Sequence, residues 1–214
     1  HPRSGVGPVA AMRLSALCLC AIWFVLASAC RTPADSAVSG RDIPRDSLVV
    51  MASGSDLESG HPLVAVHPLT RQLHRHALFV TLVRLDSLLQ PVPYFARSWE
   101  WSADRTVLTF ALDSTLHWHD GVPTTASDVV FTLRAVQDST VASPRRADLS
   151  ALDAVDTLGR HAVRLTFTAP QPRLPIVLAE LPLAPRHVLD TVPRERWRQS
   201  TFATSPVGNG PFRF

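Results

Sequence analysis

The sequence predicts an α/β fold, and three stretches of the chain carry that prediction. Residues 106–112 alternate between apolar and other side chains, which is the pattern of a strand with one buried face. Thr125 and Asp128 have the spacing of a helix start, where a hydroxyl caps free N–H groups and a carboxylate suits the first turn. Residues 154–167 indicate a β-hairpin around Gly159. Strands and a capped helix in one chain favour a mixed α/β domain.

The other elements are predicted from apolar runs and the residues that interrupt them. Residues 47–52 form a short apolar run that indicates a buried strand. Residues 69–85 carry apolar side chains at helical spacing, and the proline-punctuated residues 90–93 indicate a loop. Residues 172–183 are predicted as an apolar helix bounded by prolines, and residues 194–198 as a charged helix.

Composition argues against several classes of function. The chain has 214 residues, 46% of them hydrophobic and 18% charged, which is a globular composition. All 21 basic residues are arginines, against 18 acidic residues. Two of these arginines lie in residues 1–29, where there is no acidic residue. Residues 30–214 therefore carry nearly equal numbers of acidic and basic side chains, and they lack the surplus of positive charge that binding to nucleic acid requires. The sequence contains no nucleophile elbow, phosphate loop or C-x-x-C motif.

The N-terminal segment has the pattern of an export signal. Arg13 precedes the apolar run 14–29, which is shorter than the roughly 20 residues of a membrane span. We therefore expect residues 1–29 to be a signal peptide, with residues 1–11 as upstream sequence read through in frame. Small residues directly before Cys30 predict a lipoprotein, in which this cysteine is acylated.

The residues after the signal favour the lipoprotein interpretation. Residues 30–46 are rich in Ser, Asp, Pro and Gly, and we expect them to be a lipid-anchored tether. The alternative is an ordinary cleavage site at 27–29, which would leave Cys30 as a free thiol. In either case Cys18 and Cys20 leave with the signal, so the mature chain has no internal disulfide.

Two candidate sites can be named from local patterns alone. Ser53 and Gly54 follow the predicted strand 47–52 and are candidate ligand neighbours, because open α/β sheets bind ligands beyond the carboxyl ends of their strands. An ordinary loop is an equally good interpretation. His117 and His119 lie two apart and could share one zinc ion, as in an exported zinc hydrolase. No third ligand follows them, because Asp120 leads directly into Gly121, which together form a turn pair.

Three blocks of the chain resemble the family 5 extracellular solute-binding proteins of ABC transporters, the dipeptide, oligopeptide and nickel-binding type. These are Pro93-Tyr94-Phe95-Ala96-Arg97-Ser98-Trp99-Glu100, Trp118-His119-Asp120-Gly121-Val122-Pro123-Thr124-Thr125-Ala126-Ser127-Asp128-Val129-Val130 and Gly208-Asn209-Gly210-Pro211-Phe212. The sequence departs from the family pattern at Phe95, His117 and Asn209. The resemblance also accounts for the His119 segment as a turn rather than a metal site.

The resemblance implies the N-terminal part of a two-lobed, type 2 periplasmic-binding-protein fold, a mixed sheet with an inserted α+β subdomain. Residues 47–70 would be the first part of the large lobe, residues 71–190 the inserted smaller subdomain, and residues 191–214 the return to the large lobe, truncated within a strand. Gly208, Asn209, Gly210 and Pro211 would form the hinge or return strand.

The resemblance also implies a function without catalytic residues, metal or cofactor. A peptide or other small solute would be captured between two lobes and passed to ABC permease subunits, with the protein held at the periplasmic or cell-surface side by its lipid. The alternative is a ligand-sensing domain of a regulator or receptor. The export signal and Cys30 argue against that alternative, because such domains lack both.

Overall fold

The computed structural model describes residues 54 and 56–214, which belong to one compact unit, Gly54–Phe214. The predicted signal peptide, Cys30, the tether, the strand 47–52 and Ser53 lie outside the described residues. Among the described residues, no helix has the length and apolar character needed to cross a bilayer.

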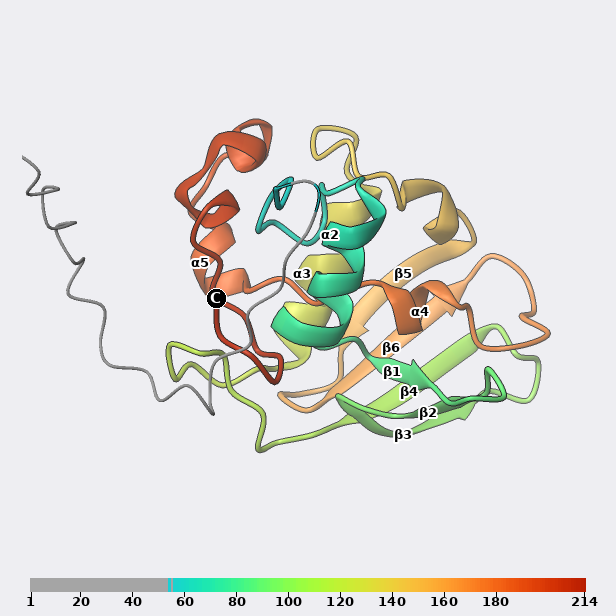
Figure 1. The fold of residues 1–214 in the computed structure, drawn as a ribbon. Helices are drawn as coiled ribbons and strands as arrows, with labels where there is room; N and C mark the ends of the chain where they lie inside the picture. Colours follow the sequence, from blue (N-terminus) through green and yellow to red (C-terminus); the bar gives the residue numbers. More distant parts are fainter. Residues whose placement is uncertain (1–53, 55) are drawn as a thin grey trace, which may run out of the picture. The chain divides into compact units, whose positions relative to one another are not determined.

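A four-stranded antiparallel sheet forms one layer of this unit (Figure 1). Its strands, in the spatial order β3-β4-β6-β5, are β3 Ala96–Trp101, β4 Val107–Leu112, β6 Ala162–Phe167 and β5 Leu152–Thr157. The central strands pair so that Phe110 lies opposite Val163, and both side chains are fully buried. The predicted strand and hairpin are confirmed, including the turn at Gly159, whose φ is +81°.

Helix α3, Ala126–Gln137, begins where the sequence predicts. The Asp128 carboxylate accepts a hydrogen bond from Thr125 N at 2.8 Å, which is half of a capping box. The other carboxylate oxygen accepts from Arg186 N at 3.0 Å, so this buried acid also fixes the start of α5, Arg186–Leu189.

The helix predicted over residues 69–85 is correct only in its first part. Helix α2, Pro68–Leu73, continues into the π-helical turn η2, His74–Leu78, and the chain is extended from Phe79 onward. The carbonyl of Leu78 accepts hydrogen bonds from Asn209 N and Gly210 N, at 3.1 and 2.9 Å. That carbonyl is therefore committed to a distant segment rather than to the next helical turn.

The prediction for the following residues is also corrected by the structure. Strand β1, Val83–Leu85, pairs with β2, Pro91–Pro93, where the sequence predicted a helix end and a loop. The turn between them is held by Asp86, whose Oδ1 accepts from the backbone N–H groups of Leu88 and Gln90, both at 2.8 Å.

The helix predicted over residues 172–183 is confined to α4, Val177–Glu180. Pro172, Pro175 and Pro182 interrupt the run, and proline lacks the N–H that a helix interior needs. The charged segment 194–198 is helical as predicted, but as the 3₁₀-helix η4, Arg194–Gln199. Two further 3₁₀ turns are η3, Arg146–Leu149, and η5, Thr201–Ala203.

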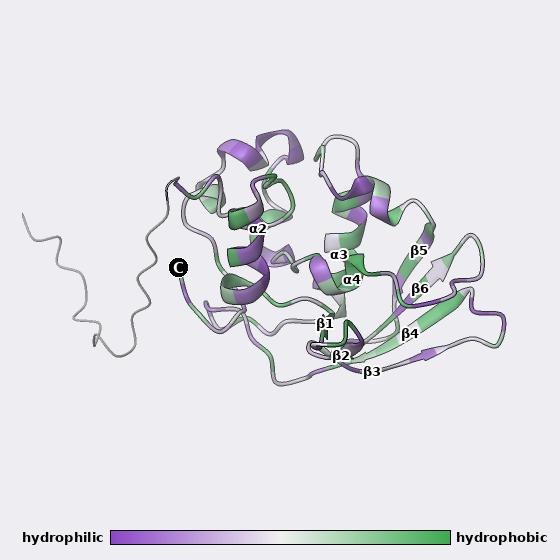
Figure 2. Ribbon diagram, turned by 45° about the vertical axis from the view of Figure 1, so that its right-hand side comes forward, coloured by the Kyte–Doolittle hydropathy of each residue, from purple (hydrophilic) through white to green (hydrophobic). Residues whose placement is uncertain are grey.

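The core lies between the helices and one face of the sheet. Figures 1 and 2 show α2 and α3 on the same side of the strands, and β4 as a largely apolar strand. Three side chains of β4 and three of β6 point into this core: Leu108, Phe110, Leu112, Val163, Leu165 and Phe167. The opposite face carries polar or small residues such as Thr109 and Arg164, as expected for an antiparallel sheet covered on one side.

A second group of buried rings lies where the C-terminal segments meet the first residues of the unit. We call it the histidine–aromatic cluster, and it comprises His61, His74, Phe79, Trp197 and Phe202. His61 stacks on Trp197 with ring centroids 4.8 Å apart, and His74 meets the Phe79 ring edge-on at 5.5 Å. The cluster joins residues that are far apart in sequence.

Candidate functional site

The predicted return segment, Gly208–Pro211, runs between the end of η2 and the His119 turn. His119 N donates to Gly208 O at 2.8 Å, and His119 Nε2 lies 2.9 Å from Gly210 O. Because a carbonyl only accepts, Nε2 carries the proton, and the buried Nδ1 has no hydrogen-bond partner among the residues that the structure describes. Asn209 is buried, and its Oδ1 accepts from Val80 N at 2.9 Å.

We call this arrangement the clamp, formed by Leu78, His119, Gly208, Asn209 and Gly210. Both glycines are required by space. A Cβ on Gly208 would lie 2.1 Å from Leu78 O, and a Cβ on Gly210 would lie 2.5 Å from Ala77 O. The segment is irregular backbone in this structure, and its role as a return strand stays a prediction. Its predicted hinge role stays a prediction.

The structure gives the two histidines of the zinc alternative different partners. His117 Nδ1 lies 2.7 Å from Thr115 O, and His119 Nε2 is occupied by the clamp. In the described part of the chain, no three His, Cys, Asp or Glu side chains gather as metal ligands would. The turn predicted at Asp120-Gly121 is present, with Gly121 at φ +91° and its N–H donating to Trp118 O.

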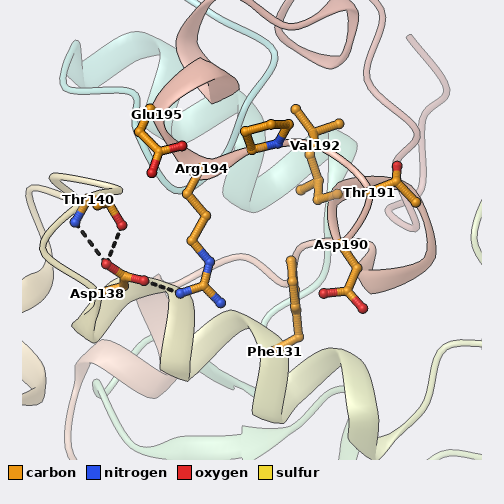
Figure 3. Close-up of a pocket in the computed structure, with 10 residues that line it drawn as sticks. Phe131, Asp138, Thr140, Asp190, Thr191, Val192, Arg194 and Glu195 are labelled. Atoms are coloured by element: carbon orange, nitrogen blue, oxygen red, sulfur yellow. Dashed lines mark hydrogen bonds and ion pairs between the residues drawn. The ribbon is translucent and has the colours of Figure 1, made fainter.

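A polar hollow of about 480 Å³ lies between the C-terminal end of α3 and residues 189–195 (Figure 3). Phe131 stands at its floor, and Arg194 crosses it to form an ion pair with Asp138. The pKa of Asp138 is lowered to about 2, because Thr140 donates to it through its hydroxyl and its N–H, with a further contribution from Arg194. Asp190, Thr191 and Glu195 complete the polar rim.

Sequence reasoning did not find this hollow. Asp138 and Arg194 are separated by 56 residues, and each belongs to a different local pattern. The one local signal is the Asp138-Ser139-Thr140 turn, which is a common loop feature and points to no ligand. Among the predicted ligand neighbours, Gly54 is exposed with open space around it, and Ser53 lies outside the described residues.

A family model describes residues 90–214: "Bacterial extracellular solute-binding proteins, family 5 Middle". A putative ABC transporter peptide-binding protein of Brucella ovis is 31% identical over 130 residues, which are 60% of this chain and 24% of that protein. A probable peptide ABC transporter periplasmic-binding protein of Sinorhizobium fredii is 31% identical over 144 residues, 67% of this chain and 26% of that protein. The chain thus spans about a quarter of the curated relatives it matches.

Solved structures agree with this match. NikZ from Campylobacter jejuni, solved in complex with Ni(L-His), superposes with a TM-score of 0.68 and 27% identity, covering 80% of this chain and 33% of NikZ. CtaP from Listeria monocytogenes, a substrate-binding protein of an ABC transporter, gives a TM-score of 0.65 and 27% identity over 74% of this chain and 32% of CtaP. The fold is therefore part of a type 2 periplasmic-binding-protein fold, and the chain belongs to the bacterial extracellular solute-binding proteins of family 5.

Proposed function

We propose that this chain is part of the substrate-binding lipoprotein of an ABC importer, which captures a peptide or related small solute between two lobes and delivers it to a membrane permease. The observation that carries the proposal is the match of residues 90–214 to the family, supported by the superposition on solute-binding proteins. Family members bind and release a solute rather than transform it, so the proposal needs no catalytic group.

The polar hollow is our candidate for this chain's share of the solute site. It offers an aromatic wall in Phe131, a guanidinium in Arg194 and carboxylates in Asp190 and Glu195. A zwitterionic ligand such as a peptide needs partners of both charges beside an apolar surface. In a two-lobed binder, a second lobe would enclose the ligand by a hinge motion.

The division into lobes belongs to the same proposal. Residues 47–70 would begin the large lobe, residues 71–190 would form the inserted subdomain, and residues 191–214 would return to the large lobe. The clamp holds this return segment against the end of η2 through backbone hydrogen bonds. We therefore infer that Gly208–Pro211 is held in place beside the hinge between the lobes. We also propose that Ser53 and Gly54 lie next to the bound solute.

Calorimetry with a mixed peptide library, followed by nickel chelates, tests solute capture. We expect the complete mature protein to bind its solute tightly and residues 31–214 alone to bind weakly, because one lobe supplies only part of the buried contact. Arg194→Ala should weaken binding by the complete protein roughly tenfold, about 1.4 kcal/mol. Arg146→Ala is the matched control, since Arg146 is exposed on η3 and lies outside the hollow. Equal affinity in the short and complete forms would contradict the two-lobe arrangement.

The lipid anchor is tested separately. A single acyl chain holds a protein at a membrane only marginally, so stable anchoring needs the several chains of a lipoprotein. Metabolic labelling with a fatty acid should mark the wild-type chain, and Cys30→Ala should abolish both the label and processing at this position. A wild-type chain without label would show that Cys30 is not acylated, and it would leave solute capture untouched.

A further inference from the structure

A separate hollow of about 310 Å³ lies where η2, β1 and α4 meet. Its lining is cationic: Arg75 and His76 come from η2 and Arg84 from β1, beside Leu85 and Ala179. No carboxylate of the described part of the chain lines it. A hollow of this volume is at the small end of ligand pockets, so it suits a compact group rather than a whole peptide.

The two arginines differ in how closely a carboxylate approaches them. The nearest carboxylate is that of Glu180, which lies 2.5 Å from Arg145 Nη2 but 3.5 Å from Arg75 Nη1. Glu180 thus holds both arginines, Arg145 through Oε2 at the shorter distance and Arg75 through Oε1 at the longer one. The Arg84 guanidinium lies 3.6 Å above the centre of the Tyr94 ring, and no carboxylate of residues 54 and 56–214 pairs with it.

His76 adds a neutral donor to this pair. Arg75 Nε donates to His76 Nε2 at 3.1 Å, so a neutral His76 ring carries its proton on Nδ1. Partial burial lowers the pKa of His76, and the charges of Arg75 and Arg84 lower it further. A lowered pKa favours the neutral ring, whose Nδ1–H can donate a hydrogen bond.

We propose that this hollow binds a phosphate group, with Arg75 and Arg84 as its charged partners and His76 as its neutral donor. Guanidinium groups recognise phosphate through paired N–H donors. Here the two groups come from different elements, so they can reach different oxygens of a tetrahedral anion. Leu85 and Ala179 give an apolar wall for whatever carbon chain the phosphate carries. The proposal stands apart from solute capture, because it uses other residues and another hollow.

The phosphate has two possible sources, a soluble phosphate or phosphate ester, or the headgroup of an anionic phospholipid. Calorimetry of the complete mature protein with inorganic phosphate tests the first source. Flotation with vesicles of phosphatidylglycerol, compared with phosphatidylcholine, tests the second on protein whose Cys30→Ala substitution removes any lipid. We expect binding in at least one arm, with a Kd in the millimolar range or tighter for phosphate itself.

Variants of Arg84 test whether phosphate or vesicle binding occurs at this hollow. Arg84→Ala should reduce phosphate affinity or vesicle capture at least about tenfold, and Arg84→Lys should lose less because it keeps the charge without the paired donors. Arg164→Ala is the matched control, since Arg164 is exposed on the opposite face of β6. Unchanged thermal unfolding of the Arg84 variants keeps the comparison valid. Binding in neither arm, or equal loss in Arg84→Ala and Arg164→Ala, would overturn the proposal.

Discussion

The clamp and the histidine–aromatic cluster both fasten the C-terminal segments to the body of the unit, but by opposite means. The clamp uses backbone carbonyls and N–H groups at hydrogen-bonding distance, with two glycines that leave no room for a side chain. The cluster uses stacked and edge-on rings, and three of its four imidazole nitrogens have no hydrogen-bond partner within residues 54 and 56–214. We therefore expect the clamp to be destabilised by substitutions that add side-chain atoms. We expect the cluster to be destabilised when its histidines are protonated at low pH.

The largest effect is expected from an added methyl group in the clamp. Gly208→Ala places a Cβ 2.1 Å from Leu78 O. The Leu78 carbonyl and the Gly208 backbone that would carry this Cβ are both held by hydrogen bonds, so neither can easily move away. We expect the free energy of unfolding to fall by about 4 kcal/mol or more, above the usual cost of overpacking. Urea unfolding followed by tryptophan fluorescence measures this.

A substitution at Gly159 distinguishes the effect of a steric clash from the effect of backbone strain. Gly159 has a φ of +81° but nothing within 4 Å of its Cβ position, so Gly159→Ala should cost only about 1 kcal/mol. Equal losses in the two variants would mean that close packing in the clamp is not what makes Gly208 necessary.

The cluster should respond to pH instead. Burial lowers the pKa of His61 to about 3, helped by His74 and Arg198, and lowers that of His74 to about 4, where Ser59 and Glu58 oppose the shift. The unfolded chain then binds protons more readily than the folded chain below the ordinary value of 6.5. The free energy of unfolding is therefore highest above pH 6.5 and decreases as the pH falls toward 4. We expect a decrease of roughly 2 kcal/mol for each imidazole between about pH 7 and pH 5.

His74→Leu tests this assignment. Among the described residues, neither buried ring nitrogen of His74 has a hydrogen bond of ordinary geometry, and the Ser59 backbone only approaches the ring, so leucine removes the titrating group at little cost in lost hydrogen bonds. We expect the slope of unfolding free energy against pH to fall by about half between roughly pH 5 and pH 7. An unchanged slope in this variant would place the acid sensitivity elsewhere in the chain.

The sheet and the clamp show what the sequence could and could not predict. The strand 107–112, the hairpin around Gly159 and the start of α3 were predictable, because each signal lies within a few residues. The break after Leu78 was not, since the apolar spacing of residues 79–85 fits a helix. The helix ends there because the Leu78 carbonyl and the Val80 N–H are bonded to Asn209, more than a hundred residues away.

The candidate sites also depend on contacts between residues that are far apart in the sequence. Asp138 and Arg194, and likewise His119 and Gly210, are brought together only by the fold, across 56 and 91 residues. The sequence singled out Gly208–Pro211 through a family motif, and the physical reason for its glycines became visible only with the backbone of residues 77–79 beside it. In residues 172–183, the apolar spacing predicts a longer helix than the structure has, because the prolines allow only one helical turn.

A smaller loss is expected when the clamp keeps its shape but loses one hydrogen bond. Asn209→Ala leaves the buried N–H of Val80 without its acceptor at 2.9 Å. Leaving a buried donor unsatisfied costs about 1–3 kcal/mol, so we expect a loss of about 2 kcal/mol in urea unfolding. Amide hydrogen exchange at Val80 should rise in parallel. Protection at Val80 equal to that of the wild type would show that another group replaces Asn209.

The smallest effect is expected at His119, and it bears directly on the zinc alternative. His119→Ala removes the Nε2–H that donates to Gly210 O, but the bond from His119 N to Gly208 O remains, so we expect a loss of about 1 kcal/mol. His117→Ala is the control, because its ring is exposed and Thr115 O is its one hydrogen-bond partner among the described residues, and it should change stability by less than about 0.5 kcal/mol. If both histidines are structural, the double variant of the complete protein keeps its solute affinity, and metal analysis finds no stoichiometric zinc to lose. Zinc that is present in the wild type and absent from the double variant would instead make the pair a metal site, and the clamp would then be only one state of His119.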